Sequence, residues 1–322
     1  MFGSQRNCCE PKSCILHRIP TNLYKSMMKN RARTAFIISY LAPAVLIYAV
    51  FVIWPVIQAF GFSFFKWSGL SQDKKFVGLD NFKTLFHDNI FWLSLLHNAT
   101  IFVIGGSVIL ALGLAVAHSM QGEGKLQKAL RSVYLFPNVM SLVVVAILWQ
   151  FLFNPRMGLL NALIQLFKKQ EHRIDILGTP TTALGGIIVT FVWFAAGFYI
   201  MLFSAGIRQI PEEVVEASKL DGAEGMVRFR KITLPLLWSV GRISLVYLVI
   251  NTLNVFALVF LMTTGGPDRK TEVMLTYLYE QAFVNSDYGA ATALAVANFV
   301  IVMLVSGIIL RITRKDPTGV TR

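Results

Sequence analysis

The sequence predicts an all-α integral membrane protein with six transmembrane helices, two of which are joined by a helical hairpin on the cytoplasmic side. The first observation is composition: 55% of the 322 residues are apolar and only 15% are charged, against roughly 25% charged in soluble domains. The second is a mean hydropathy of +0.60. The third is a net charge of +13, which in so apolar a chain indicates basic residues collected on one side of a membrane. Intrinsic disorder is excluded because 25 Phe and long aliphatic runs collapse into packed structure.

Six apolar runs are long enough to cross a bilayer core, which needs about 20 residues of helix. Arg242 is the only charged residue inside these runs before the last position, and it lies near one end, where its side chain reaches the interface. Residues 1–34 are polar and basic, unlike a secretory signal, so the first run stays in the membrane as an anchor. The runs are residues 35–62, 97–119, 132–153, 183–206, 236–262 and 289–311.

The charges sort by side of the membrane. Six spans place both termini on one side, which carries 20 Lys and Arg against 8 Asp and Glu, a balance of +12. The other side has a balance of +1. The positive-inside rule puts both termini in the cytoplasm, and nucleic-acid binding is excluded because no basic patch with interleaved aromatic residues is present. The predicted parts are a basic cytoplasmic N-terminal tail (1–34), a six-span domain (35–312) with a cytoplasmic loop (208–235), and a cytoplasmic C-terminal tail (313–322).

Catalytic and metal-binding signatures are missing from the sequence. It contains no phosphate-binding loop and no HExxH or GxSxG pattern. Cys8, Cys9 and Cys14 lie in the N-terminal tail with a spacing unlike that of a zinc module, so we interpret them as free thiols. Ionisable residues are nearly absent from mid-membrane, which argues against a proton-relay pump or an ion-coupled carrier. We therefore expect no enzyme and no metal site, and any driving energy must come from another subunit.

The cytoplasmic loop between the fourth and fifth runs has the pattern of a helical hairpin. Pro211 suits the first position of a helix, with acidic residues in its first turn. Gly222 suits the residue just past the helix end, and a second short helix is predicted from Ala223 to Lys231. Helical spacing alone leaves two interpretations open, a hairpin lying at the membrane interface and a docking surface for a partner.

The spacing in this loop resembles the EAA loop of ABC importer permeases. Glu-Ala-Ser, three residues, Gly, nine residues and Ile-x-Leu-Pro run from Glu216 to Pro235, and Ser218 stands where the family usually has Ala. The resemblance implies that the hairpin is a pair of coupling helices seated in a cleft of a cytoplasmic ATPase, which binds the ATP and Mg²⁺, so that this chain needs no cofactor of its own. The coupling residues it implies are Glu216, Ala217, Ser218, Asp221, Gly222, Ala223 and Phe229.

Further segments resemble the carbohydrate importer permeases on the MalF/UgpA-like side. This resemblance implies a heterodimer with a second, MalG/UgpC-like permease in the bacterial inner membrane. It also implies two ATP-binding subunits and an extracytoplasmic solute-binding protein. The chain shows neither the extra N-terminal spans nor the large periplasmic insert of the maltose protein, and so resembles the compact six-span members. The segments are Phe76–Phe82, Leu135–Pro137, Phe153–Pro155, Gly158–Asn161 and Thr264–Pro267.

A sugar site inside a membrane needs polar side chains for the hydroxyl groups and aromatic faces for the ring C–H surfaces. Polar mid-span candidates are Asn138, Ser141, Asn251, Thr252 and Asn254, and hydrogen bonding between helices is the alternative role for each. Resemblance to the maltose permease implies substrate-facing positions, of which Asn138, Asn251 and Thr252 agree with the polar candidates. Trp193 and Phe198 are candidates for stacking. The implied positions are Asn138, Leu142, Phe194, Phe198, Leu248, Asn251, Thr252 and Val255.

The sequence thus predicts a permease subunit that translocates an oligosaccharide or related sugar by alternating access, coupled to a separate ATPase and in contact with membrane lipid. A neutral substrate is favoured because no Arg or Lys lies at mid-span. Two alternatives remain, an ABC permease for another small solute such as glycerol-3-phosphate and an ion-coupled carrier. The sequence does not specify which sugar is carried.

Overall fold

The computed structural model describes residues 30–69, 73–120, 124, 133–168 and 174–314. The chain divides into two compact units, Met1–Gln58 and Ala59–Arg322. Most of the two predicted tails, including the three cysteines, lies outside the described residues. Helix α2 begins at Asn30, inside the predicted N-terminal tail.

The described part of the first unit is helical throughout. Helix α2 (Asn30–Tyr48) continues into a π-helical turn, η1 (Ala49–Ile53), and then into α3 (Trp54–Phe62), which crosses into the second unit. Residues Ala35–Phe62 are long and apolar enough to cross a membrane, as the sequence predicts for the first span.

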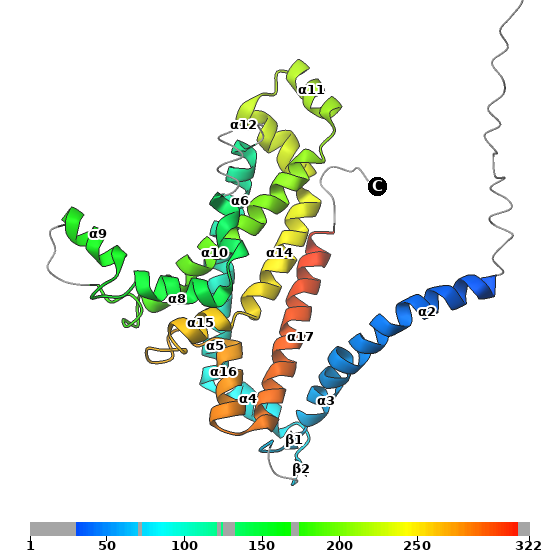
Figure 1. Ribbon diagram of the computed structural model, residues 1–322, viewed down its shortest axis with the longest axis vertical. Helices are drawn as coiled ribbons and strands as arrows, with labels where there is room; N and C mark the ends of the chain where they lie inside the picture. Colours follow the sequence, from blue (N-terminus) through cyan, green and yellow to red (C-terminus); the bar gives the residue numbers. More distant parts are fainter. Residues whose placement is uncertain (1–29, 70–72, 121–123, 125–132, 169–173, 315–322) are drawn as a thin grey trace, which may run out of the picture. The chain divides into compact units, whose positions relative to one another are not determined.

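The second unit is an assembly of helices with one two-stranded antiparallel ribbon, in which Phe65 pairs with Phe76 (Figure 1). A short helix, Val133–Val139, precedes α8. The other elements in chain order are β1 (Phe65–Lys66), β2 (Lys75–Phe76), α4 (Asp80–His87), α5 (Asn89–Thr100), η2 (Ile101–Gly105), α6 (Gly106–Ser119), α8 (Leu142–Leu152), α9 (Leu159–Lys168), α10 (Ala183–Arg208), α11 (Glu212–Leu220), α12 (Gly225–Arg228), η3 (Phe229–Thr233), α13 (Leu234–Leu236), α14 (Trp238–Leu253), α15 (Ala257–Met262), α16 (Met274–Tyr279), η4 (Glu280–Val284) and α17 (Tyr288–Ile312).

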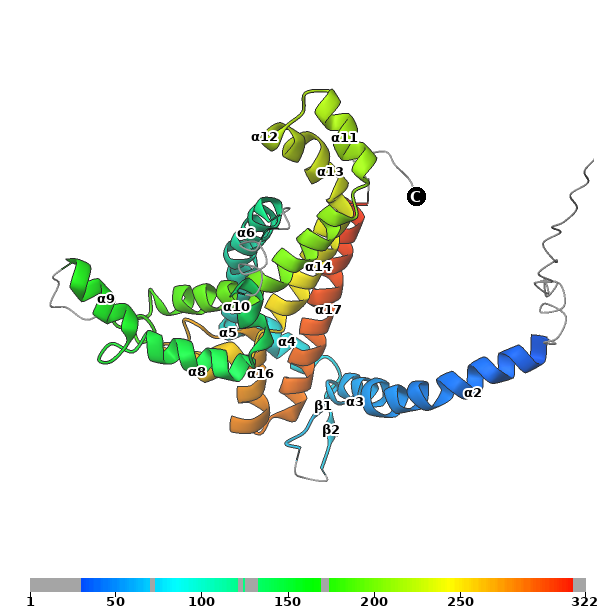
Figure 2. The same ribbon diagram turned by 45° about the horizontal axis from the view of Figure 1, so that its top comes forward.

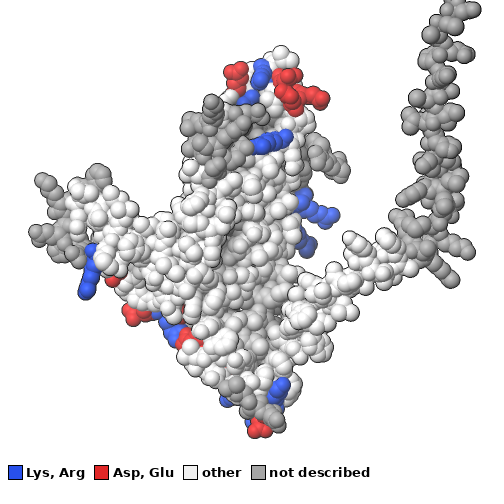
Figure 3. Space-filling model, viewed as in Figure 1, with Lys and Arg blue, Asp and Glu red and all other residues white. Residues whose placement is uncertain are grey.

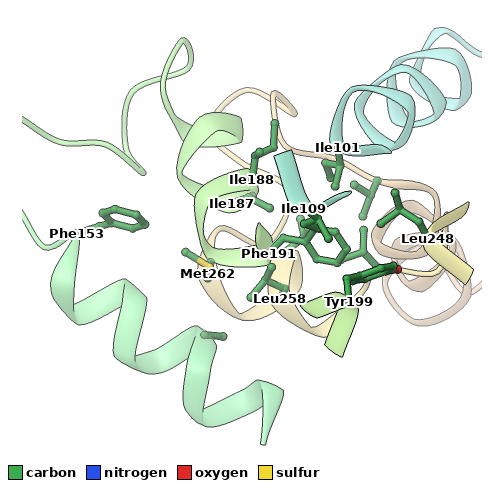
Figure 4. Packing of buried hydrophobic residues seen from close by; sticks show 14 of the residues in the cluster. Ile101, Ile109, Phe153, Ile187, Ile188, Phe191, Tyr199, Leu248, Leu258 and Met262 are labelled. Atoms are coloured by element: carbon green, nitrogen blue, oxygen red, sulfur yellow. The ribbon is translucent and has the colours of Figure 1, made fainter. Parts of the chain in front are cut away.

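The long helices of this unit pack side by side. Helix α6 lies along α10, and α14 lies along α17, in both views (Figures 1 and 2). Glycine allows the first pair to approach closely: a methyl group built on Gly113 of α6 reaches within 3.1–3.3 Å of Phe203 and Tyr199 on α10. Figure 4 shows the apolar core that α6, α10 and α14 share with α15, where Ile109, Phe191 and Leu248 are buried.

Four helical stretches could cross a membrane without interruption, and two more could do so as bent pairs. The continuous ones are Ala35–Phe62, Asn89–Ser119, Ala183–Arg208 and Tyr288–Ile312. Among the described residues the helices therefore allow four crossings, or up to six if each bent pair is one span. The predicted count of six remains a prediction.

The third predicted span, 132–153, is not one helix. Val133–Val139 and Leu142–Leu152 meet at 111°. The backbone N–H of Met140 closes the first helix on the carbonyl of Pro137, and Ser141 is extended before the second helix starts. Hydropathy misses the bend because both arms are apolar.

The fifth predicted span, 236–262, is also interrupted. Helix α14 ends at Leu253 and a separate helix, α15, begins at Ala257. Between them Phe256 leaves the helical conformation, with φ −132° and ψ −67°. Upstream, α14 is bent by 67° from the helical stretch Gly225–Leu236. Averaging hydropathy along the chain cannot detect these changes of direction.

On the face seen in Figure 3, most charged side chains of the second unit lie near its two ends. In Figure 3 Lys, Arg, Asp and Glu gather at the end that holds α11 and α12 and again at the opposite end, near α15, β1 and β2. Between them lies a wide surface that is largely free of charge. This distribution suits a protein whose middle lies in hydrocarbon and whose two ends lie in water.

Candidate functional site

The predicted hairpin is present and its turn is held by a Schellman motif. Helix α11 ends at Leu220, and Gly222 adopts a φ of +72°, a conformation that glycine takes at little cost. The N–H of Ala223 donates to the carbonyl of Ser218 over 2.8 Å, and that of Gly222 donates to Lys219 over 3.1 Å. These two bonds satisfy carbonyls that the helix end leaves open and reverse the chain.

The hairpin differs from the predicted bounds by one or two residues. Pro211 is the cap residue before α11 and not its first residue, since its ψ of 139° is extended. The second helix starts at Gly225 and not at Ala223, because the Schellman bonds use Ala223 and Glu224 is extended. It then continues through η3 and α13 to Leu236.

The hairpin presents a mixed acidic and apolar surface. Glu216, Ala217 and Asp221 are exposed, and Leu220 and Met226 are 90% and 64% exposed. Exposed large apolar side chains beside carboxylates are unusual on a free surface and typical of a contact surface. Ser218 is buried and its hydroxyl donates to the carbonyl of Val215 over 2.6 Å, so the residue that departs from the resemblance has a local structural role.

Phe229 connects the hairpin to the membrane helices. Its ring lies 4.5 Å from the imidazole ring of His118 in the last turn of α6. The hairpin also continues α10 at one end, because only residues 209–211 separate α10 from α11. The hairpin is therefore in contact with α6 and continuous with α10.

One group of the predicted substrate residues gathers where the helix Val133–Val139 meets α10. The Asn138 side-chain amide reaches the carbonyl of Phe194 at 3.5 Å. Leu142 packs partly buried against the core. Trp193 lines a cavity of about 540 Å³ with Tyr134, and its ring lies 5.6 Å from that of Trp149.

A second group lies between α10 and α14. The Phe198 ring is 4.8 Å from that of Tyr247, and the half-buried Asn251 donates from its amide to the Tyr247 carbonyl over 2.8 Å. Leu248, Thr252 and Val255 are buried. The structure thus places the predicted substrate residues in two groups and buries three of them in the core, and their roles stay predictions.

Sequence reasoning missed a polar network between α5, the end of α14 and the start of α16. The Asn98 amide donates to the Thr252 carbonyl over 2.6 Å, and its oxygen accepts from the N–H of Met274 over 2.9 Å. The ring Nδ1 of His97 lies 2.7 Å from the carbonyl of Glu272. The sequence offered one signal for this network: His97 and Asn98 are adjacent polar residues at the start of the apolar run 97–119.

Beside this network lies a cluster of charges in the loop after the Thr264–Pro267 segment. Arg269 forms a two-pronged ion pair with Glu280, at 2.7 and 2.6 Å, and lies 3.5 Å from the carboxylate of Glu272. The hydrogen bond with Glu280 raises the pKa of Arg269. Burial raises the pKa of Glu272, against the opposing effects of a hydrogen bond from Thr276 and the charge of Arg269.

Two segments that carry the resemblance are fixed by side-chain amides. Asn81 donates to the carbonyls of Ser63 and Phe65 at 2.8 and 3.0 Å. Asn161 exchanges two hydrogen bonds with the backbone of Ile174. In these places asparagine replaces backbone pairing in irregular loops. Within the described ranges, no group of three or more His, Cys, Asp or Glu side chains could hold a metal ion.

Comparison with known proteins identifies the family of this chain. The family model described as "binding-protein-dependent transport system inner membrane component" matches residues 106–315. The chain belongs to this family. As a permease it is a transport subunit of the inner membrane and not an enzyme, and the predicted resemblance of the chain to ABC importer permeases is confirmed.

Relatives of this permease support the same assignment. It is 34% identical over 269 residues to the probable ABC transporter permease protein YurN of Bacillus subtilis, covering 83% of this chain and 92% of the relative. It is 32% identical over 298 residues to the diacetylchitobiose uptake system permease protein NgcF of Streptomyces coelicolor, covering 89% and 84%. It is 29% identical over 293 residues to the trehalose/maltose transport system permease protein MalF of Thermococcus litoralis, covering 91% and 98%.

Solved structures confirm the fold class. A chain of a bacterial ABC transporter involved in the import of the acidic polysaccharide alginate superimposes with a TM-score of 0.77 at 23% identity, covering 91% of this permease and 98% of that chain. The predicted all-α membrane fold is therefore correct. Orientation of the termini and the cytoplasmic position of the hairpin remain predictions from the charge count.

Proposed function

We propose that this permease forms half of the path of an ATP-driven importer for a carbohydrate received from an extracytoplasmic binding protein. Support comes from relatives whose names state diacetylchitobiose uptake, trehalose/maltose transport and multiple-sugar-binding transport. A similar fold occurs in an alginate transporter in complex with a pentasaccharide-bound periplasmic protein. The other half of the path is a second, MalG/UgpC-like permease.

The hairpin α11–α12 is the observation that carries the coupling proposal. It is a rigid turn, since the Schellman bonds fix Gly222, and it projects Glu216, Leu220 and Met226 to the outside. An ATPase subunit that binds ATP and Mg²⁺ engages this surface. Two such subunits, one per permease, supply the energy.

The mechanism is alternating access. When the ATPase subunits close, they draw the hairpins of the two permeases together. Phe229 and the short 209–211 connection pass this movement to α6 and α10. Because the helix Val133–Val139 contacts α10 at Gly197, the predicted substrate residues on both move with it. The cavity then opens to the outer side, and ATP hydrolysis resets it.

Substrate contacts are assigned to the predicted residues. Asn138, Asn251 and Thr252 replace the hydration of sugar hydroxyl groups, with Phe198 and Trp193 as faces for the ring C–H surfaces. Asn251 is the more accessible of the two candidates on α14, because it is half-buried and its amide is bonded only within its own helix, whereas Asn138 is exposed beside α10. Thr252 is fully buried here and reaches substrate only after the helices move apart.

The test is ATP-driven uptake in proteoliposomes that contain the complete transporter, with the binding protein added outside. We expect Glu216→Lys and Gly222→Pro to insert and assemble yet lose substrate-stimulated ATPase activity and uptake. Proline cannot adopt the φ of +72° and removes the N–H that bonds Lys219. Glu213→Lys, exposed on the same helix outside the predicted set, is the matched control. Normal stimulated ATPase activity in both test variants contradicts the assignment.

A further inference from the structure

A cavity of about 350 Å³ lies between α15 and the segment α16–η4. Its position corresponds to the charged end of the unit opposite the hairpin (Figures 1 and 3), which the charge count predicts to face outward. None of the predicted substrate residues lines it. The lining side chains that matter here are Phe260, Thr264, Arg269, Thr276, Tyr279 and Glu280.

Aromatic rings form one wall of this cavity. The Tyr279 ring lies 4.7 Å from that of Phe260 and 4.9 Å from that of Phe283. Phe256 stacks on Phe260 at 5.0 Å and 21°. Of these four rings, Phe260 and Tyr279 line the cavity. A supported aromatic face beside an open volume is a platform for a flat, partly apolar ring.

Hydrogen-bonding groups also line the cavity. The Arg269 side chain is 40% exposed and that of Glu280 is 26% exposed. Arg269 uses two of its N–H groups on Glu280, and a guanidinium has five, so donors remain for a ligand. Each carboxylate oxygen of Glu280 keeps a further lone pair. Neighbouring donors and acceptors of this kind match vicinal hydroxyl groups.

The charge balance of the cavity selects against anions. One guanidinium faces two carboxylates, Glu280 at hydrogen-bond distance and Glu272 at 3.5 Å. With both carboxylates ionised the cavity is net negative, and with Glu272 protonated it is neutral. In neither state does Arg269 offer an unpaired positive charge. A ligand that carries a carboxylate or phosphate is therefore repelled when both carboxylates are ionised and gains no ion pair with Arg269 in the neutral state, whereas a neutral polyol is not repelled in either state.

The loop that carries these groups is held in an unusual conformation. Thr264, Asp268 and Arg269 have positive φ values of 53°, 48° and 57°, which is uncommon for residues other than glycine. The Thr271 hydroxyl holds the loop by donating to the Gly266 carbonyl over 2.7 Å. Backbone strain that surrounding contacts maintain is frequent at ligand sites.

We propose that this cavity is an extracytoplasmic subsite for one ring of a neutral saccharide, which stacks on Tyr279 and bonds the Arg269–Glu280 pair through its hydroxyl groups. The proposal rests on the proposed function and narrows its substrate class. It also supplies a first contact on the permease that is separate from the mid-membrane residues.

Ligand binding to the full chain in lipid nanodiscs, followed by saturation-transfer-difference NMR, tests the subsite. The probes are maltotriose, trehalose and diacetylchitobiose as neutral saccharides and trigalacturonate as an anionic one. We expect at least one neutral probe to receive saturation and trigalacturonate to receive none. Tyr279→Ala weakens binding about tenfold, the scale of one lost ring contact, whereas Tyr279→Phe retains it.

Matched controls separate the subsite from other sites. Phe283→Ala removes an exposed ring of the same aromatic row that does not line the cavity, and it leaves binding unchanged. Ile250→Ala leaves this binding unchanged as well, because Ile250 is neither a predicted substrate residue nor part of the cavity lining. The double substitution Glu272→Gln with Glu280→Gln leaves Arg269 without a carboxylate partner in the cavity and gives trigalacturonate a measurable signal.

Three results would overturn the subsite: no binding of any neutral probe, equal binding by wild type and Tyr279→Ala, or binding of trigalacturonate by wild type. The proposed function fails on a different measurement, the lack of ATP-dependent uptake by the complete transporter. Uptake without probe binding to the isolated permease therefore rejects the subsite alone.

Discussion

The side chain of Asn98 holds two distant segments together: its amide donates to the carbonyl of Thr252 over 2.6 Å, and its oxygen accepts from the N–H of Met274 over 2.9 Å. Thr252 lies in the last turn of α14, where the fifth predicted span is interrupted. Both partners are buried backbone groups that no water reaches. Asparagine thus replaces the hydrogen bonds that a continuous helix would have made there.

We expect Asn98→Ala to lower the free energy of unfolding by about 3 kcal/mol, because the buried N–H of Met274 loses its side-chain partner and the Thr252 carbonyl keeps only long backbone bonds, such as the one of 3.5 Å from the N–H of Val255. Thermal unfolding of the purified permease in detergent measures this. Thr100→Ala is the control, since the Thr100 hydroxyl bonds only within its own helix, and a change below about 0.5 kcal/mol is expected. Equal effects of the two substitutions contradict the bridging role of Asn98.

Replacing glycine by alanine should have opposite effects on stability at two positions of α10, Gly197 and Gly185. A methyl group at Gly197 overlaps the backbone carbonyl of Tyr134, whereas one at Gly185 meets no atom within 4 Å. We expect Gly197→Ala to destabilise by about 2 kcal/mol through overpacking and Gly185→Ala to stabilise by about 0.5 kcal/mol through helix propensity. Melting temperatures that shift in the same direction disprove this close approach.

Gly222 and Gly78 form a second matched pair. Both have positive φ values, +72° and +58°, and a methyl group at either meets no atom within 4 Å. Alanine at each position costs about 1 kcal/mol of backbone strain. We expect only Gly222→Ala to lower ATP-driven uptake, because only that turn forms the hairpin. If Gly78→Ala lowers uptake as much, general destabilisation is the cause and not loss of coupling.

The carboxyl group of Glu272 makes the folding stability of the permease depend on pH. Burial raises its carboxyl pKa, so the protonated form favours folding. This contribution is complete below the ordinary carboxyl pKa and is lost as pH rises through the folded-state value. The melting temperature of Glu272→Gln minus that of wild type should therefore increase with pH above about 4.5. A flat difference for Glu272→Gln across this pH range refutes the assignment.

Asn251 tests the predicted substrate path. We expect Asn251→Ala to raise the substrate concentration for half-maximal uptake about fivefold, the loss of one hydrogen bond of about 1 kcal/mol. Ile250→Ala, an adjacent apolar position that is 40% exposed, is the control. Unchanged uptake kinetics in Asn251→Ala remove this residue from the site.

The family and the hairpin were accessible from the sequence because their signals are local. Hydropathy over 18 or more residues detects helices that suit a bilayer, and Gly222 with its spacing to Glu216 and Pro235 specifies a turn of one kind. The prediction of Gly222 as the residue past the end of α11 is confirmed, since helix capping depends on neighbours within six residues. The substrate residues, in contrast, remain untested by the fold.

Tertiary structure alone decided how the apolar runs bend and which polar groups meet. The 111° bend after Val139 and the break after Leu253 leave the average hydropathy unchanged, so no window along the chain detects them. Asn98 contacts Thr252 and Met274, which lie more than 150 residues away, and Arg269 and Glu280 form a cavity only when the loop folds back on η4. The sequence by itself determined which segments lie in lipid and which in water, because the free energy of transfer from water to hydrocarbon depends on the composition of each segment. The contacts depend on three-dimensional packing and appear only in the folded chain.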